Sequence, residues 1–164
     1  MSERVIEVLL DSFMKILIPG IKVTIPITVF SFALAFVISV IVAFIRYANV
    51  KILTPICKFY IWLVRGTPLL VQLYIFFYGL PSVGIVLDAI PCAILVLGLN
   101  EGAYLAESMR AALEAVPTGQ VEAGYCVGMS YIQIMMRIVL PQALRTAFPS
   151  LSNSFISLIK ESSM

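Results

Sequence analysis

A long run without charged residues constrains this sequence more than any other feature. Residues 23–45 contain no Asp, Glu, Lys or Arg, and Lys22 and Arg46 bracket the run. In an α-helix that rises about 1.5 Å per residue, such a run is long enough to cross a hydrocarbon core of roughly 30 Å. Pro26 lies near its start, where a missing N–H costs little. We therefore predict a membrane-spanning helix over residues 23–45.

The composition supports the same environment for the whole chain. The 164 residues are 61% apolar and 12% charged, whereas an ordinary soluble domain is about 45–50% apolar and about 25% charged. The net charge of +2, without a dense basic run, argues against a nucleic-acid partner. Histidine is absent, and Cys57, Cys92 and Cys126 have no metal-ligand spacing. We predict a single domain, residues 1–164, in a lipid bilayer, with no metal or cofactor.

The N-terminal segment has a mixed character. It combines acidic and basic residues and lacks a small-residue cleavage site, so we predict no cleavable signal peptide. Apolar residues recur near helical spacing at Val5, Val8, Leu9, Phe13 and Ile16. This pattern predicts an interfacial amphipathic helix over residues 1–20, ended by Pro19-Gly20. The alternative is that this helix continues the first span outward.

Three further apolar segments follow. The second, residues 59–80, is interrupted by Arg65-Gly66-Thr67-Pro68, and the backbone groups that a proline frees need partners inside the protein. The third covers about residues 90–113. The fourth, residues 146–159, reaches only about 21 Å, so it spans only if residues 140–145 extend it. We predict an all-α, polytopic transmembrane helix bundle with about four membrane segments.

The distribution of Lys and Arg predicts the orientation of the chain. Basic residues gather in residues 46–65 and 110–145, whereas the turn at residues 79–90 has none. Both basic regions are therefore expected in the cytoplasm and the turn outside. This places the N-terminus outside, although three basic residues precede the first span.

Residues 117–142, here called the elbow, form a more polar segment between the third and fourth spans. Thr118 is a candidate cap for a helix that runs to Val127, and Gly128 can take the left-handed conformation that ends a helix. Ser130 and Gln133 have the spacing of a capping box for a second helix, which should end before Pro141.

Apolar side chains in the elbow predict a docking surface. Val121 and Tyr125 share a face of the first helix, and a second face is expected from Ile132, Met135, Met136 and Val139. Two short helices with a sharp bend fit a contact site for a partner protein. An ordinary polar loop is the alternative that spacing alone leaves open.

Three ordered motifs resemble one family. Glu122-Ala123-Gly124, followed after three residues by Gly128 and after nine more by Ile138-Val139-Leu140-Pro141, resembles the EAA loop of ABC-importer permeases, with Gly124 in place of the second Ala. Residues 65–72 and 99–107 are similar to stretches of the polar amino-acid subfamily, which handles histidine, glutamine, glutamate, arginine, cystine and opines. Residues 141–145 and 153–160 continue the resemblance.

The resemblance implies a fold, a function and a set of partners. It implies a type I importer permease in the cytoplasmic or inner membrane, multi-pass, that forms the path for a polar amino acid. Expected partners are an ABC ATPase subunit, an extracytoplasmic solute-binding protein and a second permease subunit. Permeases of this group continue for about one more span after residues 160–163, so we expect a final span to be missing here.

The resemblance also implies that the elbow couples the permease to its ATPase. The expected coupling residues are Glu122, Ala123, Gly124, Gly128, Ser130, Gln133 and Pro141. No GxxxxGK[ST] run is present to cradle phosphates, so we expect a transport subunit that is not an enzyme and has no ATPase site of its own.

Polar residues within the apolar segments are candidates for a substrate path. The set is Asn100, Glu101, Asn153 and Ser154. Glu101 can meet the ammonium group of a substrate or pair with another helix, and both readings stay open. For Glu107 we expect a pair with Arg110. Arg65 is expected either to reach toward lipid headgroups or to pair with an acid or with carbonyl groups at the break.

Other functions remain as alternatives. A self-contained secondary transporter or channel needs no docking elbow, and the sequence shows no internal repeat. A membrane scaffold does not account for the polar residues of the third segment. The sequence does not identify the amino acid, nor whether the second permease subunit is a copy of this chain.

Overall fold

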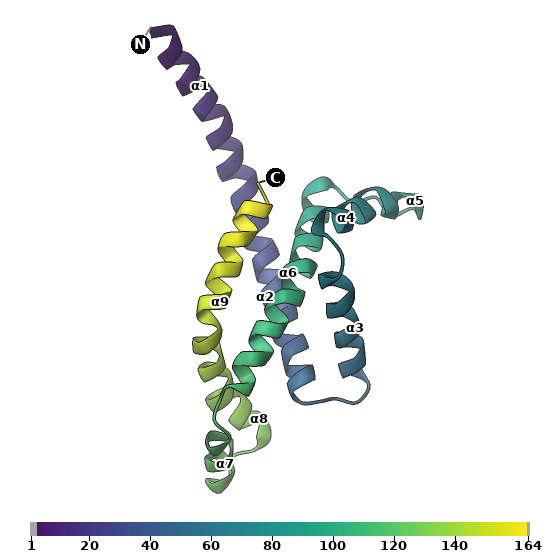
Figure 1. Ribbon diagram of the computed structural model, residues 1–164, viewed down its shortest axis with the longest axis vertical. Helices are drawn as coiled ribbons and strands as arrows, with labels where there is room; N and C mark the ends of the chain where they lie inside the picture. Colours follow the sequence, from purple (N-terminus) through teal and green to yellow (C-terminus); the bar gives the residue numbers. More distant parts are fainter. Residues whose placement is uncertain (1–2, 164) are drawn as a thin grey trace.

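The computed structural model describes residues 3–163 and shows a bundle of helices (Figure 1). Its longer helices are α1 (Glu3–Pro19), α2 (Ile25–Tyr47), α3 (Leu53–Arg65), α6 (Ala89–Glu114) and α9 (Leu140–Glu161). The shorter ones are α4 (Leu69–Tyr74), α5 (Leu80–Ser82), α7 (Thr118–Cys126) and α8 (Tyr131–Ile134). Three π-helical turns join them: η1 (Gly20–Thr24), η2 (Ile75–Gly79) and η3 (Met135–Val139).

The structure contains fewer helices that are able to cross a membrane than the four or so segments that the sequence predicts. By length and composition, residues Asp11–Tyr47 and Ala89–Glu114 can each cross a membrane, and the bent pair Leu53–Arg65 and Leu69–Ser82 adds a third if it is one span. The fourth apolar segment is extended at its start, since α9 begins at Leu140. Within the described residues, α9 is nevertheless not among the helices that are long and apolar enough to cross a membrane.

The predicted end of the N-terminal helix is wrong. The chain stays helical through Pro19-Gly20, because η1 joins α1 to α2, and Figure 1 shows one long rod from α1 into α2. This is the outward continuation of the first span. Residues 1 and 2 of the predicted helix lie outside the described residues. Among the apolar positions, Val8, Phe13 and Ile16 are exposed, and their place at a membrane interface stays a prediction.

Each of the three π-helical turns ends two residues before a proline. The prolines are Pro26, Pro81 and Pro141. A proline ring clashes with the carbonyl four residues earlier, and that carbonyl lies inside the π turn in all three cases. The wider turn gives the ring room, so the helix continues. The prediction that the second elbow helix ends before Pro141 is therefore wrong.

Close contact between α2 and α6 forms the centre of the bundle. A Cβ atom at Gly98 would lie 2.7 Å from Leu34 Cδ2, and one at Gly102 would lie 3.1 Å from Ile38 Cγ2. Glycine at these two positions of α6 therefore lets α2 approach closely, as small residues do between membrane helices.

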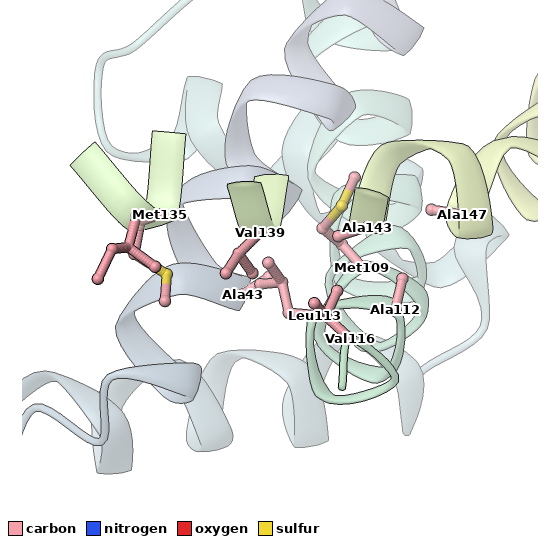
Figure 2. Packing of buried hydrophobic residues seen from close by; sticks show 10 residues of the cluster. Ala43, Met109, Ala112, Leu113, Val116, Met135, Val139, Ala143 and Ala147 are labelled. Carbon is pink, nitrogen blue, oxygen red and sulfur yellow. The ribbon is translucent and has the colours of Figure 1, made fainter. Parts of the chain in front are cut away.

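A buried apolar cluster joins this centre to the elbow. Ala43 of α2, Met109 and Leu113 of α6, Val139 of η3 and Ala143 of α9 are all fully buried in it. Figure 2 shows these side chains gathered where the three helices meet. The same cluster explains why α9 begins against α6: its first turn fills the space beside Met109 and Leu113.

The arrangement of the connections agrees with the predicted orientation. The loop between α2 and α3 and the elbow helices α7 and α8 lie at the same, lower end of Figure 1, while both chain ends lie toward the other end. The side of the membrane that each end faces stays a prediction.

Candidate functional site

A polar cavity of 620 Å³ lies beside the break between α3 and α4. Residues from the break, from α6 and from α9 line it: Arg65, Gly66, Thr67, Pro68, Leu69, Asn100, Glu101, Tyr104, Ser150, Asn153, Ser154, Ser157 and Glu161. All four predicted substrate-path residues are in this set. The structure thus brings together two pairs of residues that are about 50 positions apart in the sequence, while their contact with a substrate stays a prediction.

The break itself is held by one side chain. The axes of residues Leu53–Arg65 and Leu69–Ser82 differ by 102°. Pro68 has no N–H for the carbonyl of Val64, and Gln72 Nε2 donates to that carbonyl instead, at 2.8 Å. Gln72 Nε2 also lies 2.8 Å from Thr67 Oγ1. Asn100 Nδ2 donates to Gln72 Oε1 at 3.2 Å, which ties the break to α6.

Asn100 and Glu101 lie near the middle of α6. Their exposed fractions are 7% and 6%, so α6 places a carboxyl and an amide in a sheltered part of the cavity wall. A buried carboxyl is costly without a partner. Ser154 of α9 is a hydrogen-bond partner for Glu101, and contact of this carboxyl with a cationic part of a ligand stays a prediction.

Arg65 does not form the pair with an acid or with carbonyl groups that was one of its two predicted arrangements. Its guanidinium lies over the ring of Tyr104, with Cζ 5.0 Å from the ring centroid. Within residues 3–163 it forms no ion pair and donates no hydrogen bond. The residue is exposed, ends α3 and lines the cavity next to the middle of α6, and its reach toward lipid headgroups stays a prediction.

The third wall of the cavity comes from α9. Asn153 and Ser154 face it together with Ser157 and Glu161, and Ser150 Oγ donates to Ser108 Oγ of α6 at 3.0 Å. The cavity therefore offers carboxyl, guanidinium, amide and hydroxyl groups at once. Such a set can bind a small polar ligand that carries both charges.

Gln72 at the break, and Tyr104 and Glu161 in the cavity wall, were not predicted as site residues from the sequence. Gln72 was part of a motif, yet its role at the break was not inferred, although its position four residues after Pro68 in an apolar run is a usable signal. The spacing of Tyr104 and Glu161 in the sequence does not indicate that they line the cavity, because their positions depend on how α6 and α9 pack. Within the described residues neither Lys160 nor Glu161 forms an ion pair.

The elbow is built largely as predicted from its capping signals. Gly128 has φ of +78°, and the capping box is present, with Ser130 N donating to Gln133 Oε1 at 2.9 Å. Thr118 does not cap α7, because Pro117 holds the N-cap position and Thr118 is the first helical residue. Pro141 lies in the first turn of α9, beyond the elbow's bend.

Gly124 packs α7 against the second half of the elbow. A Cβ atom there would lie 2.7 Å from Ile134 Cγ1 and 3.3 Å from Ile138 Cδ1. Ile134 is fully buried, so it has little room to move. Replacement of Gly124 by Ala, which the family pattern makes look mild, would instead create a clash.

The expected apolar face of the second elbow helix is divided between two sides. Met135 and Val139 point into the buried cluster, with exposed fractions of 4% and 0%. Ile132 and Met136 point outward, at 73% and 58%. Tyr125 and Val127 of the first half are exposed as well. In a regular α-helix these four positions share one broad face, so the division reflects which side packs on the neighbouring helices.

The outward surface of the elbow also carries polar groups. Glu122 and Ala123 are exposed on α7, and Glu122 forms no ion pair within residues 3–163. Exposed aromatic and Met side chains, here Tyr125 and Met136, are residue types enriched at surfaces that contact another protein.

A group of charges lies between the cavity and the elbow. Arg110 Nε lies 3.1 Å from Glu107 Oε2, as predicted. Glu107 also pairs with Arg46 at the end of α2, and Arg110 pairs with Glu114. The Arg46 pair joins α2 to α6 and was not predicted, because the two residues are 61 positions apart.

Known proteins share both the sequence and the fold. The chain is 46% identical over 154 residues to the L-cystine transport system permease protein TcyB of Bacillus subtilis (strain 168), across 94% of this chain and 66% of the relative. It is 41% identical over 157 residues to the octopine transport system permease protein OccM of Rhizobium radiobacter, across 90% and 64%. The chain thus spans about two thirds of the length of these curated relatives.

A solved structure described as an amino acid ABC transporter with histidines superposes with a TM-score of 0.82 at 32% identity, across 94% of this chain and 72% of that chain. An inward-facing structure of the MetNI methionine ABC transporter gives a TM-score of 0.77 at 26% identity, across 99% and 74%. The predicted all-α, type I ABC-importer permease fold is confirmed by this likeness. The family model that describes the binding-protein-dependent transport system inner membrane component matches residues 35–164, and this chain belongs to that family.

Proposed function

We propose that this chain is the multi-pass permease subunit of an ATP-driven importer, and that it forms part of the path for a polar amino acid. The observation that carries the proposal is the polar cavity at the break between α3 and α4, lined by Asn100, Glu101, Asn153 and Ser154. A cavity with both charges inside an apolar bundle suits a zwitterionic ligand. The names of the relatives, which move cystine and octopine, support the same substrate class.

The elbow supplies the coupling in this proposal. Its outward residues, including Ile132 and Met136, dock onto an ABC ATPase subunit, while its inward residues Met135 and Val139 pack on α6 and α9. These two helices also form walls of the cavity. A displacement of the elbow by the ATPase therefore reaches the cavity through rigid helices. Glu122, Ala123, Gly124, Gly128, Ser130, Gln133 and Pro141 shape this docking unit.

The remaining partners complete the transporter. A second permease subunit, identical or different, closes the path on the open side of the cavity, and an extracytoplasmic solute-binding protein delivers the amino acid. The chain hydrolyses no ATP by itself, since the energy comes from the ATPase subunit.

Reconstitution in lipid vesicles tests this function. The chain with its ATPase and binding protein should accumulate radiolabelled L-cystine, L-glutamine or L-histidine only when ATP is present. The purified chain alone should show no ATP hydrolysis above a mock preparation. Accumulation without ATP would favour a self-contained secondary transporter, and ATP turnover by the lone chain would refute a passive subunit.

A further inference from the structure

An apolar groove lies between α2 and α9. Its volume is 510 Å³, and it is lined by Phe32 and Phe36 of α2 and by five residues of α9 between Phe148 and Ile156. Phe32 and Phe155 meet edge to face, with their ring centroids 5.1 Å apart. Phe148 and Ile156 are 67% and 51% exposed. The groove is therefore an open aromatic surface and not part of the closed core.

The groove and the polar cavity lie on opposite faces of α9. Ser154 and Ser157 are among the residues that line the cavity, whereas Phe148 and Phe155 line the groove. At about 100° per residue, the two sets of α9 residues point in roughly opposite directions. A second permease subunit that closes the open side of the cavity, as proposed above, therefore leaves the groove facing away from it. An apolar face that points away from a polar path suits contact with lipid.

A cation lies at one end of the groove. Arg145 and Phe148 line an adjoining hollow of 350 Å³, and Phe148 lines the groove as well. Arg145 precedes Phe148 by three residues and Ser152 by seven, so all three share one face of α9. Arg145 is exposed and forms no ion pair within residues 3–163. Neither α2 nor residues 140–160 contain an acidic residue, so an anion would complement this end of the groove.

From this geometry we propose that the groove binds one acyl chain of an anionic phospholipid, and that the phosphate of this lipid pairs with Arg145. The guanidinium can donate two parallel hydrogen bonds to a phosphate. From Arg145 to Ile156 the helix rises about 16 Å, which is close to half of a hydrocarbon core of roughly 30 Å and so to one leaflet.

The position of Arg145 fits the same ligand. It lies in the second turn of α9, next to the elbow, at the end of the bundle that is expected in the cytoplasm. Basic pockets between membrane helices on that side bind anionic headgroups. The site is separate from the polar cavity and adds lipid binding to the proposed transport.

Retention of defined lipids tests this inference. The purified full chain is mixed in detergent with equal amounts of dioleoyl phosphatidylglycerol and dioleoyl phosphatidylcholine, and bound lipids are counted by native mass spectrometry. Arg145→Gln removes the cation, and Ser152→Phe fills the groove. Lys160→Gln is the control, because Lys160 is an exposed cation at the opposite end of the same helix that lines neither the groove nor the adjoining hollow.

The wild type should bind one phosphatidylglycerol about fivefold more tightly than phosphatidylcholine, the usual effect of one basic residue near an anionic lipid. Arg145→Gln should bind both lipids equally, Lys160→Gln should keep the preference, and Ser152→Phe should retain neither lipid. A preference that persists in Arg145→Gln, or that is absent from the wild type, would overturn the phosphate contact. A lipid retained by Ser152→Phe would overturn the role of the groove. A lipid-free wild-type dimer that Ser152→Phe dissociates would show that a second copy occupies the groove instead.

Discussion

Gly124 and Gly128 lie four residues apart in the elbow, and different physical constraints act on them. At Gly128 the backbone has φ of +78°, yet a Cβ atom there would meet no atom within 4 Å. At Gly124 the backbone is helical, and the space is filled by Ile134. Conformation therefore requires glycine at one position, and packing requires it at the other.

The first prediction concerns conformation. Gly128→Val should strain the elbow by roughly 1–2 kcal/mol, the usual cost of a left-handed non-glycine residue. Gly128→Asn should be milder, because Asn adopts this conformation more readily. Both proteins should insert normally, and Val alone should weaken capture of the ATPase subunit and substrate-stimulated hydrolysis. Normal coupling in the Val variant would show that the bend tolerates other geometries.

The second prediction concerns packing. Gly124→Ala should displace Ile134 and separate α7 from the second half of the elbow, because the added methyl group lies inside contact distance. Overpacking of this kind costs about 1–3 kcal/mol. We expect reduced ATPase binding, measured by pull-down. Wild-type binding by the single variant would contradict the clash.

At the scale of elements, helix breaks depend on how freed backbone groups find partners. The sequence identified the break at residues 65–68, the long helices and the capping box, since each follows from local residue types. It did not identify the π turns before Pro26, Pro81 and Pro141, because a proline in the sequence is compatible with either an ended or a widened helix. The two-sided face of residues 132–139 likewise depends on the partner helices.

The third prediction concerns the break between α3 and α4. Gln72→Leu removes the donor to the Val64 carbonyl and the acceptor for Asn100. Each buried group left without a partner costs about 1–3 kcal/mol. On heating, the variant complex should aggregate at a lower temperature than the wild-type complex, measured as the temperature at which the sample ceases to be monodisperse. Lys58→Leu, at an exposed position of α3 outside the elbow and the cavity, is the control and should not change this temperature. Equal stability of both variants would exclude the role given to Gln72.

At the scale of the whole molecule, packing decides what the sequence leaves open. Asn100, Glu101, Asn153 and Ser154 could be chosen from the sequence because polar groups in apolar segments are costly. That they share one cavity with Arg65, Tyr104 and Glu161 depends on the contacts of α6 with α3 and α9. The pair between Arg46 and Glu107, which fixes α2 to α6 between the cavity and the elbow, equally follows only from the fold.

The central claim is that this cavity is part of the path of the amino acid, and uptake by Glu101→Gln tests it most directly. The measurement is ATP-dependent uptake of a radiolabelled amino acid by vesicles with the complete transporter, at equal membrane levels. Asp11→Asn is the control, since Asp11 is exposed and far along the chain from the cavity. Loss of a charged hydrogen bond predicts a decrease of about tenfold or more for Glu101→Gln and wild-type uptake for Asp11→Asn. Wild-type uptake by Glu101→Gln would contradict the account.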